Sequence, residues 1–211
     1  MKKLVACIAC GNNSTRLYAK PLQLLDIENK ISIIEHIYKV LVKINSINDI
    51  VFAIANGSEN LFYVEYAKKN NIKFIKGDSI DVLHRLIKAC KKGEGSDVFR
   101  ITPECPFFLY DLIDSSWKIH KKNKIEVSLL DNVPDGAGFE ILSLDALTYS
   151  WKNGEKKHRS EYSSLFIREN KKKFKINYIK VPKKLQRPDL RMTVDNPEDL
   201  ILARDIYKKF K

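Results

Sequence analysis

The chain has 211 residues, of which 44% are hydrophobic and 30% charged, and its net charge is +12 at pH 7. A chain of this length can bury a sizeable hydrophobic core without disulfides. No stretch approaches the roughly 20 apolar residues of a membrane span, so we expect no membrane association. We expect one domain over residues 1–211. The lysine runs are dispersed and lack interleaved stacking aromatics, which argues against nucleic-acid binding. The N-terminus does not resemble a signal peptide, so we expect a cytoplasmic protein.

Strand-like and helix-like segments alternate through the first half. Ser32 is a plausible N-cap, Glu35 stands at the capping-box position, and Gly93 follows the third helical segment. The alternation predicts a parallel sheet with helices on both faces. We expect strands at 4–9, 49–55, 72–75 and 98–101, and helices at 32–44, 59–70, 79–92 and 109–120.

The second half is less regular. Residues 132–136 have the composition of a turn. Pro197 opens the last helical segment, with Glu198 and Asp199 in its first turn, as is typical of a helix N-terminus. We expect strands at 125–130, 139–142 and 174–181, and helices at 144–151, 160–170 and 197–210.

Two of the four cysteines, Cys7 and Cys10, form a Cys-x-x-Cys pair at the end of the first expected strand. Residues three apart on a strand face opposite sides, so this pair is badly placed to share a metal or a disulfide. Cys90 and Cys105 are isolated, and no second cysteine or histidine pair completes a tetrahedral site. We expect four buried free thiols.

The loop after the first strand, from Gly11 to Lys20, has the composition of a phosphate site. Small residues expose backbone N–H groups to an anion, and Arg16 and Lys20, four residues apart, neutralise it. Spacing alone leaves the alternative that both are surface charges in a turn.

Two carboxylates lie in the other expected ligand loops. In open α/β sheets ligands bind beyond the carboxyl ends of the strands. Glu104 follows the fourth strand, and Asp195 precedes the last helix. Cations with separated carboxylates suit a nucleoside triphosphate with Mg²⁺. The alternatives are that both carboxylates cap the helices that follow them.

Five segments, in this order, resemble motifs of the cytidylyltransferase family that makes CMP-activated acidic sugars, and the spore-coat polysaccharide branch resembles them most. The chain departs from the family in carrying Tyr18-Ala19 where Pro-Gly is usual, Glu104 where Asp is usual, and Gly11, Gly138 and Tyr162 where other residues are frequent. The five segments are 14–20, 77–83, 100–106, 134–136 with Glu140, and 191–200.

The resemblance implies an α/β fold, a three-layer αβα sandwich with a mostly parallel mixed sheet, as in nucleotide-diphospho-sugar (GT-A-like) transferases. It implies a CTP-dependent cytidylyltransferase that uses Mg²⁺ (or Mn²⁺), activates an acidic sugar or similar small acidic acceptor for surface polysaccharide or glycan biosynthesis, and releases pyrophosphate. The implied catalytic residues are Arg16, Lys20, Glu104 and Asp195, with Glu104 and Asp195 as metal ligands. The implied nucleotide-binding residues are Ala9, Cys10, Gly11, Asn13, Ser14, Arg16, Lys20, Asp78, Arg100 and Thr102, and the implied acceptor-binding residues are Asp135, Glu140, Tyr162 and Arg168.

Two other functions fit the same pattern: a sugar-1-phosphate nucleotidyltransferase that uses another base, and a non-catalytic nucleotide-binding protein on the same fold. The resemblance also implies a homodimer. Residues 139–151 are apolar and aromatic, and they form either the dimer surface or part of the core. The sequence does not identify the acceptor.

Overall fold

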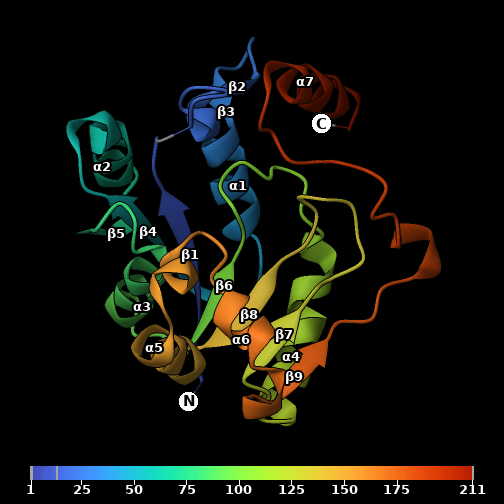
Figure 1. The fold of residues 1–211 in the computed structure, drawn as a ribbon. Helices are drawn as coiled ribbons and strands as arrows, with labels where there is room; N and C mark the ends of the chain where they lie inside the picture. Colours follow the sequence, from blue (N-terminus) through green and yellow to red (C-terminus); the bar gives the residue numbers. More distant parts are fainter. Residues whose placement is uncertain (1, 13, 211) are drawn as a thin grey trace.

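The computed structural model describes residues 2–12 and 14–210, and its main feature is a seven-stranded sheet in the order β5-β4-β1-β6-β8-β7-β9 (Figure 1). Strand β8 is antiparallel to its neighbours β6 and β7, and the other pairs in the sheet are parallel. The expected mostly parallel mixed sheet is therefore confirmed. The strands are β1 Leu4–Cys10, β4 Ile47–Ala55, β5 Lys73–Gly77, β6 Asp97–Arg100, β7 Val127–Leu129, β8 Glu140–Ser143 and β9 Ile176–Tyr178.

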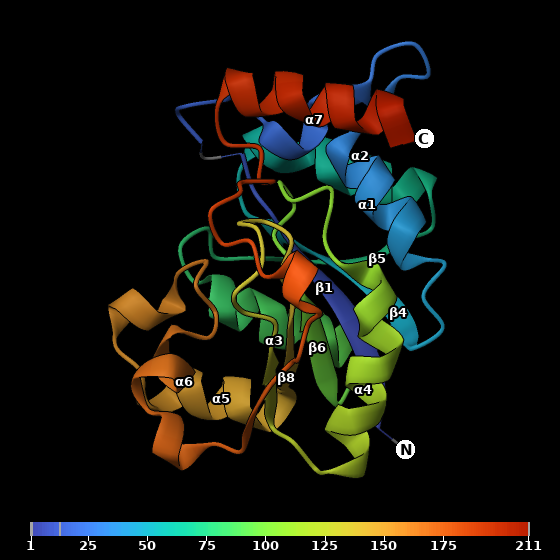
Figure 2. The ribbon, with the colours of Figure 1, turned by 90° about the vertical axis from the view of Figure 1, so that its right-hand side faces the viewer.

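Helices cover both faces of the sheet, which completes the three layers (Figure 2). Alternate residues of β1 separate the two cores: Leu4 and Ile8 face α1, α2, α4 and α7, whereas Val5 and Cys7 face α3, α5 and α6. Helix α7 lies across α1, where Tyr207 meets His36 edge to face. The helices are α1 Ile33–Leu41, α2 Leu61–Lys69, α3 Val82–Lys92, α4 Ile113–Lys122, α5 Leu144–Asn153, α6 Leu165–Glu169 and α7 Pro197–Phe210.

The four cysteines are buried free thiols, as expected. Cys7 and Cys10 belong to opposite cores, so the geometry of the strand separates the Cys-x-x-Cys pair. Burial raises the pKa of both thiols well above the ordinary value, so neither has thiolate character.

Helices α1, α3 and α7 begin at residues that the capping rules favour. Ser32 and Glu35 form the expected capping box at the start of α1. Helix α3 begins at Val82, later than the expected residue 79, because Asp81 is its N-cap and its side chain accepts a hydrogen bond from the His84 amide. Pro197 opens α7 at the expected residue.

The expected helix over 160–170 is wrong in its first half, because only α6, Leu165–Glu169, is α-helical. The preceding residues are held by contacts to the sheet: Ser164 donates a hydrogen bond to Glu140, and the Glu161 carbonyl accepts one from Arg100. The sequence pattern also missed a short antiparallel hairpin, β2 Leu24–Asp26 and β3 Ile31–Ser32, that lies beside α7.

Residues 139–151 are mainly core. Strand β8 lies inside the sheet between β6 and β7, so its side chains are buried, and Ala146 and Leu147 of α5 are buried beside it. The alternative that this segment is a dimer surface is therefore wrong for most of its length. Within residues 2–12 and 14–210, no helix is both long enough and apolar enough to cross a bilayer.

Candidate active site

Two adjoining cavities, of about 380 and 400 Å³, open at the carboxyl ends of β1, β4 and β6. This is the edge of the sheet at which ligands bind in open α/β folds. Seven residues line both cavities and form their common wall: Arg16, Lys20, Arg100, Ile101, Thr102, Glu104 and Glu161.

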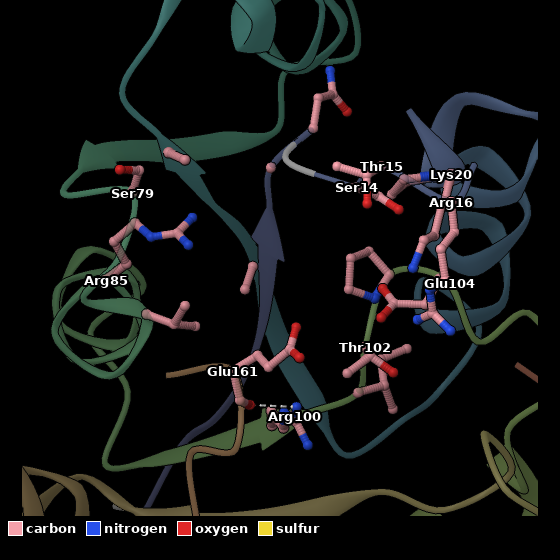
Figure 3. Close-up of a pocket in the computed structure, with 18 residues that line it drawn as sticks. Ser14, Thr15, Arg16, Lys20, Ser79, Arg85, Arg100, Thr102, Glu104 and Glu161 are labelled. Atoms are coloured by element: carbon pink, nitrogen blue, oxygen red, sulfur yellow. Dashed lines mark hydrogen bonds between the residues drawn. The ribbon is translucent and has the colours of Figure 1, made fainter. Parts of the chain in front are cut away.

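The first cavity has charged groups on two sides of the end of β1. In Figure 3, Arg16, Lys20 and Glu104 lie together on one side, and Ser79 and Arg85 lie on the other. Between them the cavity is lined by three small residues at or just after the ends of β1 and β4, which are Ala9, Gly11 and Ala55. A ligand in this cavity would lie between the cations Arg16 and Lys20 on one side and Arg85 on the other.

Asp195 is the centre of an ion-pair cluster at the common wall. Lys20 Nζ lies 2.5 Å from its Oδ1, Arg16 Nη2 lies 3.3 Å from the same oxygen, and Arg191 contacts its Oδ2. Burial by itself would raise the pKa of Asp195, but the hydrogen bonds and charges of Lys20, Arg191 and Arg16 outweigh that effect and lower it. The carboxylate is therefore held ionised and oriented by cations from two distant parts of the sequence, Arg16 and Lys20 on one side and Arg191 on the other.

Glu104 is tied to the same loop as Asp195. The Val194 amide donates a hydrogen bond of 3.0 Å to the Glu104 carbonyl, and the Glu104 side chain is half-buried in the common wall. Burial raises the pKa of its carboxyl above the ordinary value. Such a carboxylate gains most from a cation brought into the cavity.

The second cavity carries paired charges. Arg168 makes a bidentate ion pair with Asp131, at 2.9 and 2.8 Å, and lies 3.3 Å from Glu140. Asp135 lies 3.0 Å from Arg191 Nη1 and forms a backbone bridge with it. The carboxylate oxygen Oε2 of Glu140 is buried without a hydrogen-bond partner among the described residues, although Arg100 Nη1 lies 3.5 Å away.

Most of the residues expected at the site lie together. The four expected catalytic residues all line the second cavity, and so do the four expected acceptor residues, of which Tyr162 is 67% exposed. Of the expected nucleotide-binding residues, Cys10 is buried behind the cavity, and Asp78 is exposed and accepts hydrogen bonds from the Ile80 and Asp81 amides instead. Asn13 lies outside the described residues. The expected nucleotide-binding residues in the wall of the first cavity are Ala9, Gly11, Ser14, Arg16, Lys20, Arg100 and Thr102.

Several residues that line the cavities were not predicted as site residues, among them Arg85, Arg191 and Glu161. Arg85 lies on the apolar stripe of α3, and a charged residue among Val82, Leu86 and Ala89 at helical spacing was a usable signal. Arg191 stood in a matched motif without an assigned role. Glu161 left no signal, because it reaches the cavity only through the non-helical bend of 160–164.

A mostly parallel αβα sheet with a cationic loop and two carboxylates at the carboxyl ends of its strands defines the class: the chain is a nucleotidyltransferase. The family model for cytidylyltransferases matches residues 8–209, and the chain therefore belongs to the cytidylyltransferase family.

Two curated relatives align with nearly the whole chain. An uncharacterised protein of Methanocaldococcus jannaschii is 30% identical over 208 residues, which are 99% of this chain and 84% of that protein. The spore coat polysaccharide biosynthesis protein SpsF of Bacillus subtilis is 22% identical over 211 residues, 99% of this chain and 88% of that protein.

Solved structures confirm the fold. A cytidylyltransferase from Leptospira borgpetersenii superimposes with a TM-score of 0.88 at 22% identity and covers 100% of this chain and 89% of its own. A CMP:2-keto-3-deoxy-manno-octonic acid synthetase complexed with CTP superimposes with a TM-score of 0.73 at 15% identity, with 99% of each chain covered.

Proposed function

We propose that this protein transfers a cytidylyl group from CTP to an oxygen of a small sugar-type acceptor, acidic by resemblance, and releases pyrophosphate. The family membership supports cytidylyl transfer. The relative named for spore coat polysaccharide biosynthesis supports a sugar acceptor for surface glycan synthesis, and the related synthetase complexed with CTP supports the nucleotide.

The observation that carries the proposal is the common wall of the two cavities. A transferase must bring two substrates together. Here two cavities, one for each substrate, meet at Arg16, Lys20 and Glu104, and Asp195 lies beside these residues. In this proposal the first cavity holds CTP, the second holds the acceptor, and the α-phosphorus lies at the wall between them.

The reaction is an in-line displacement at the α-phosphorus. An acceptor oxygen attacks and forms a bond to phosphorus, the bond to the leaving pyrophosphate breaks, and the proton of an attacking hydroxyl is released to solvent. Lys20 and Arg16 offset the charge that develops on the leaving group. No covalent enzyme intermediate is needed, which agrees with inert, buried cysteines.

The site suits Mg²⁺. Glu104 and Asp195 present two carboxylates to one cavity, and within the described part of the chain no three His, Cys, Asp or Glu side chains gather as a metal cage. Mg²⁺ needs only one or two protein carboxylates and completes its shell with water and phosphate oxygens. When bound, it would supply charge neutralisation on the phosphates.

The test measures pyrophosphate release from CTP, Mg²⁺ and a panel of acidic sugars. We expect Lys20→Ala and Asp195→Asn to lower the rate by about a hundredfold or more, because each removes a charge at the reacting phosphate. Lys30→Ala is the matched control, since Lys30 is an exposed lysine outside both cavities.

Unchanged rates in Lys20→Ala and Asp195→Asn would sink the assignment of the site. Binding of CTP without turnover of any acceptor would favour a non-catalytic nucleotide-binding protein, and turnover with another nucleoside triphosphate would favour a different base. The homodimer is also a prediction, and size-exclusion chromatography with light scattering tests it by measuring the molar mass in solution.

A further inference from the structure

The second cavity is richer in carboxylates than in cations. The carboxylates that line it outside the common wall are Asp131, Asp135, Glu140 and Asp195, and the cations there are Arg168 and Arg191. Every guanidinium nitrogen of both arginines is already hydrogen-bonded. The partners of Arg191 are three aspartates, and those of Arg168 are Ser164, Asp131 and Glu140. An anionic group that enters this part of the cavity would therefore face carboxylates whose only cations are already engaged.

Glu140 is a buried carboxylate that lacks a donor at one of its oxygens. Its side chain is 10% exposed and lies in the lining of this cavity. Oε1 accepts hydrogen bonds from Ser164 Oγ, at 2.5 Å, and from Arg168 Nη2, at 3.3 Å. Oε2 has no hydrogen-bond partner among the described residues, although Arg100 Nη1 lies 3.5 Å away. A buried acceptor without a donor costs free energy, so a ligand that brings an N–H or O–H group to Glu140 gains by binding.

Asp131 and Tyr162 offer the same ligand group a more open approach. Asp131 shares the guanidinium of Arg168 with Glu140, and its side chain is 40% exposed. Tyr162 lines the same cavity and is 67% exposed. A protonated amine suits all three residues, because carboxylates accept its N–H groups in charge-assisted hydrogen bonds and the face of an aromatic ring attracts its charge.

We propose that the acceptor is an amino sugar, and that Asp131 and Glu140 bind its protonated amine while its attacking oxygen lies at the common wall. This inference rests on the proposed function and deepens it. Arg168 keeps its contacts when the amine binds, because each carboxylate oxygen can accept two hydrogen bonds. The acid group that the resemblance implies would then lie at the common wall, which supplies the cations Arg16, Lys20 and Arg100.

The experiment measures the dissociation constants of the full chain for glucosamine, glucose and N-acetylglucosamine by NMR titration. These three probes carry an ammonium group, a hydroxyl group and an uncharged acetamide at the same carbon of the same ring. We expect glucosamine to bind at least about tenfold more tightly than the other two, since hydrogen bonds between charged groups are roughly twice as strong as neutral ones. Raising the pH until the amine loses its proton should abolish this preference.

Two variants locate the amine. Asp131→Asn should bring the preference for glucosamine close to one, because asparagine keeps the shape of the side chain and removes its charge. Glu140→Gln should lower the same preference, and it serves as the second test if Asp131→Asn folds poorly. Asp205→Asn is the matched control and should keep the full preference, since Asp205 is an exposed aspartate of α7 outside both cavities.

Equal affinity for the three probes, tighter binding of glucose or N-acetylglucosamine, or no binding of any probe would overturn the amine site. A preference for glucosamine that survives in both variants would overturn it too, because the amine would then bind elsewhere. CTP binding to the same protein tests the proposed function separately. A protein that binds CTP and does not prefer glucosamine keeps the proposed function and loses only the amino-sugar acceptor.

Discussion

Strand β6 divides its residues between stability and function. Its last residue, Arg100, lines both cavities, while its first, Asp97, is fully buried at the opposite end. Asp97 Oδ1 lies 3.0 Å from His120 Nε2, and His120 Nδ1 lies 2.8 Å from Ser128 Oγ. The chain of contacts has the composition of a hydrolase triad, but all three residues are inaccessible, so it is a structural network.

This network predicts how stability depends on pH. Burial would raise the pKa of Asp97, but hydrogen bonds from His120 and Ser96 and the charge of Lys2 lower it overall. A carboxyl whose pKa is lower in the folded than in the unfolded protein stabilises the fold at pH values above its unfolded-state pKa, which is about 3.9. This contribution is lost as the pH falls through the folded-state pKa. We expect Asp97→Asn to lower the free energy of unfolding by about 3 kcal/mol at pH 7.

Urea unfolding at a series of pH values checks this prediction. The difference between the unmodified protein and Asp97→Asn should narrow as the pH falls below about 4, since protonation abolishes the same charge. A difference that persists unchanged to pH 2 would mean that packing, and not ionisation, explains the loss.

The two loops that close the second cavity depend on a single glycine. Gly136 has a φ of +88°, and a Cβ there would lie 2.6 Å from the Thr193 backbone nitrogen. The hydrogen bonds on either side hold the loops in contact, because the Asp135 amide donates to Leu190 and the Met192 amide donates to Asp135. The position of Asp195 is therefore set in part by a turn about 60 residues earlier in the chain.

Gly136→Ala tests that dependence. We expect the added methyl group to strain the turn and push the 190–195 segment outward, with a loss of stability of about 1–3 kcal/mol. Displacement of Asp195 by about 1 Å should also lower the rate about a hundredfold. The measurements are thermal unfolding and pyrophosphate release, and Gly154→Ala, at another crowded glycine that lines neither cavity, is the control for strain alone. A stable Gly136→Ala enzyme with normal activity would contradict the coupling.

The sequence predicts the regular elements best where periodicity and caps agree. Helix α7 began at Pro197 and α1 was capped by Ser32, as expected, because both signals are local. The sequence pattern predicts a helix over 160–164, but the segment is not helical, because its conformation depends on long-range contacts with Arg100 and Glu140. Likewise the motifs indicated Arg16, Lys20, Glu104 and Asp195, but the pairing of Asp195 with three cations is a product of the tertiary fold.

At the scale of the molecule, the site is assembled from both ends of the chain. Arg16 and Lys20 of the common wall meet Asp195 from the other end of the chain. Helix α7 then packs across α1, and its Arg204 donates a hydrogen bond to the Leu24 carbonyl of β2. An unfolded chain therefore contains no part of the site. A ligand of the site binds the folded state alone and stabilises all of it.

This linkage predicts a thermal shift. With CTP and Mg²⁺ at 100 times the dissociation constant, we expect about 2.7 kcal/mol of stabilisation, or a rise in Tm of about 5–10 °C for a chain of this size. Lys20→Ala should shrink the shift, because the triphosphate loses a cation that is 12% exposed and already aligned on Asp195. Calorimetric scans of both proteins over a range of CTP concentrations measure the effect, with Lys30→Ala as control. Equal shifts in all three proteins would place the triphosphate elsewhere than at the common wall, and the cationic loop would then be no part of the nucleotide site.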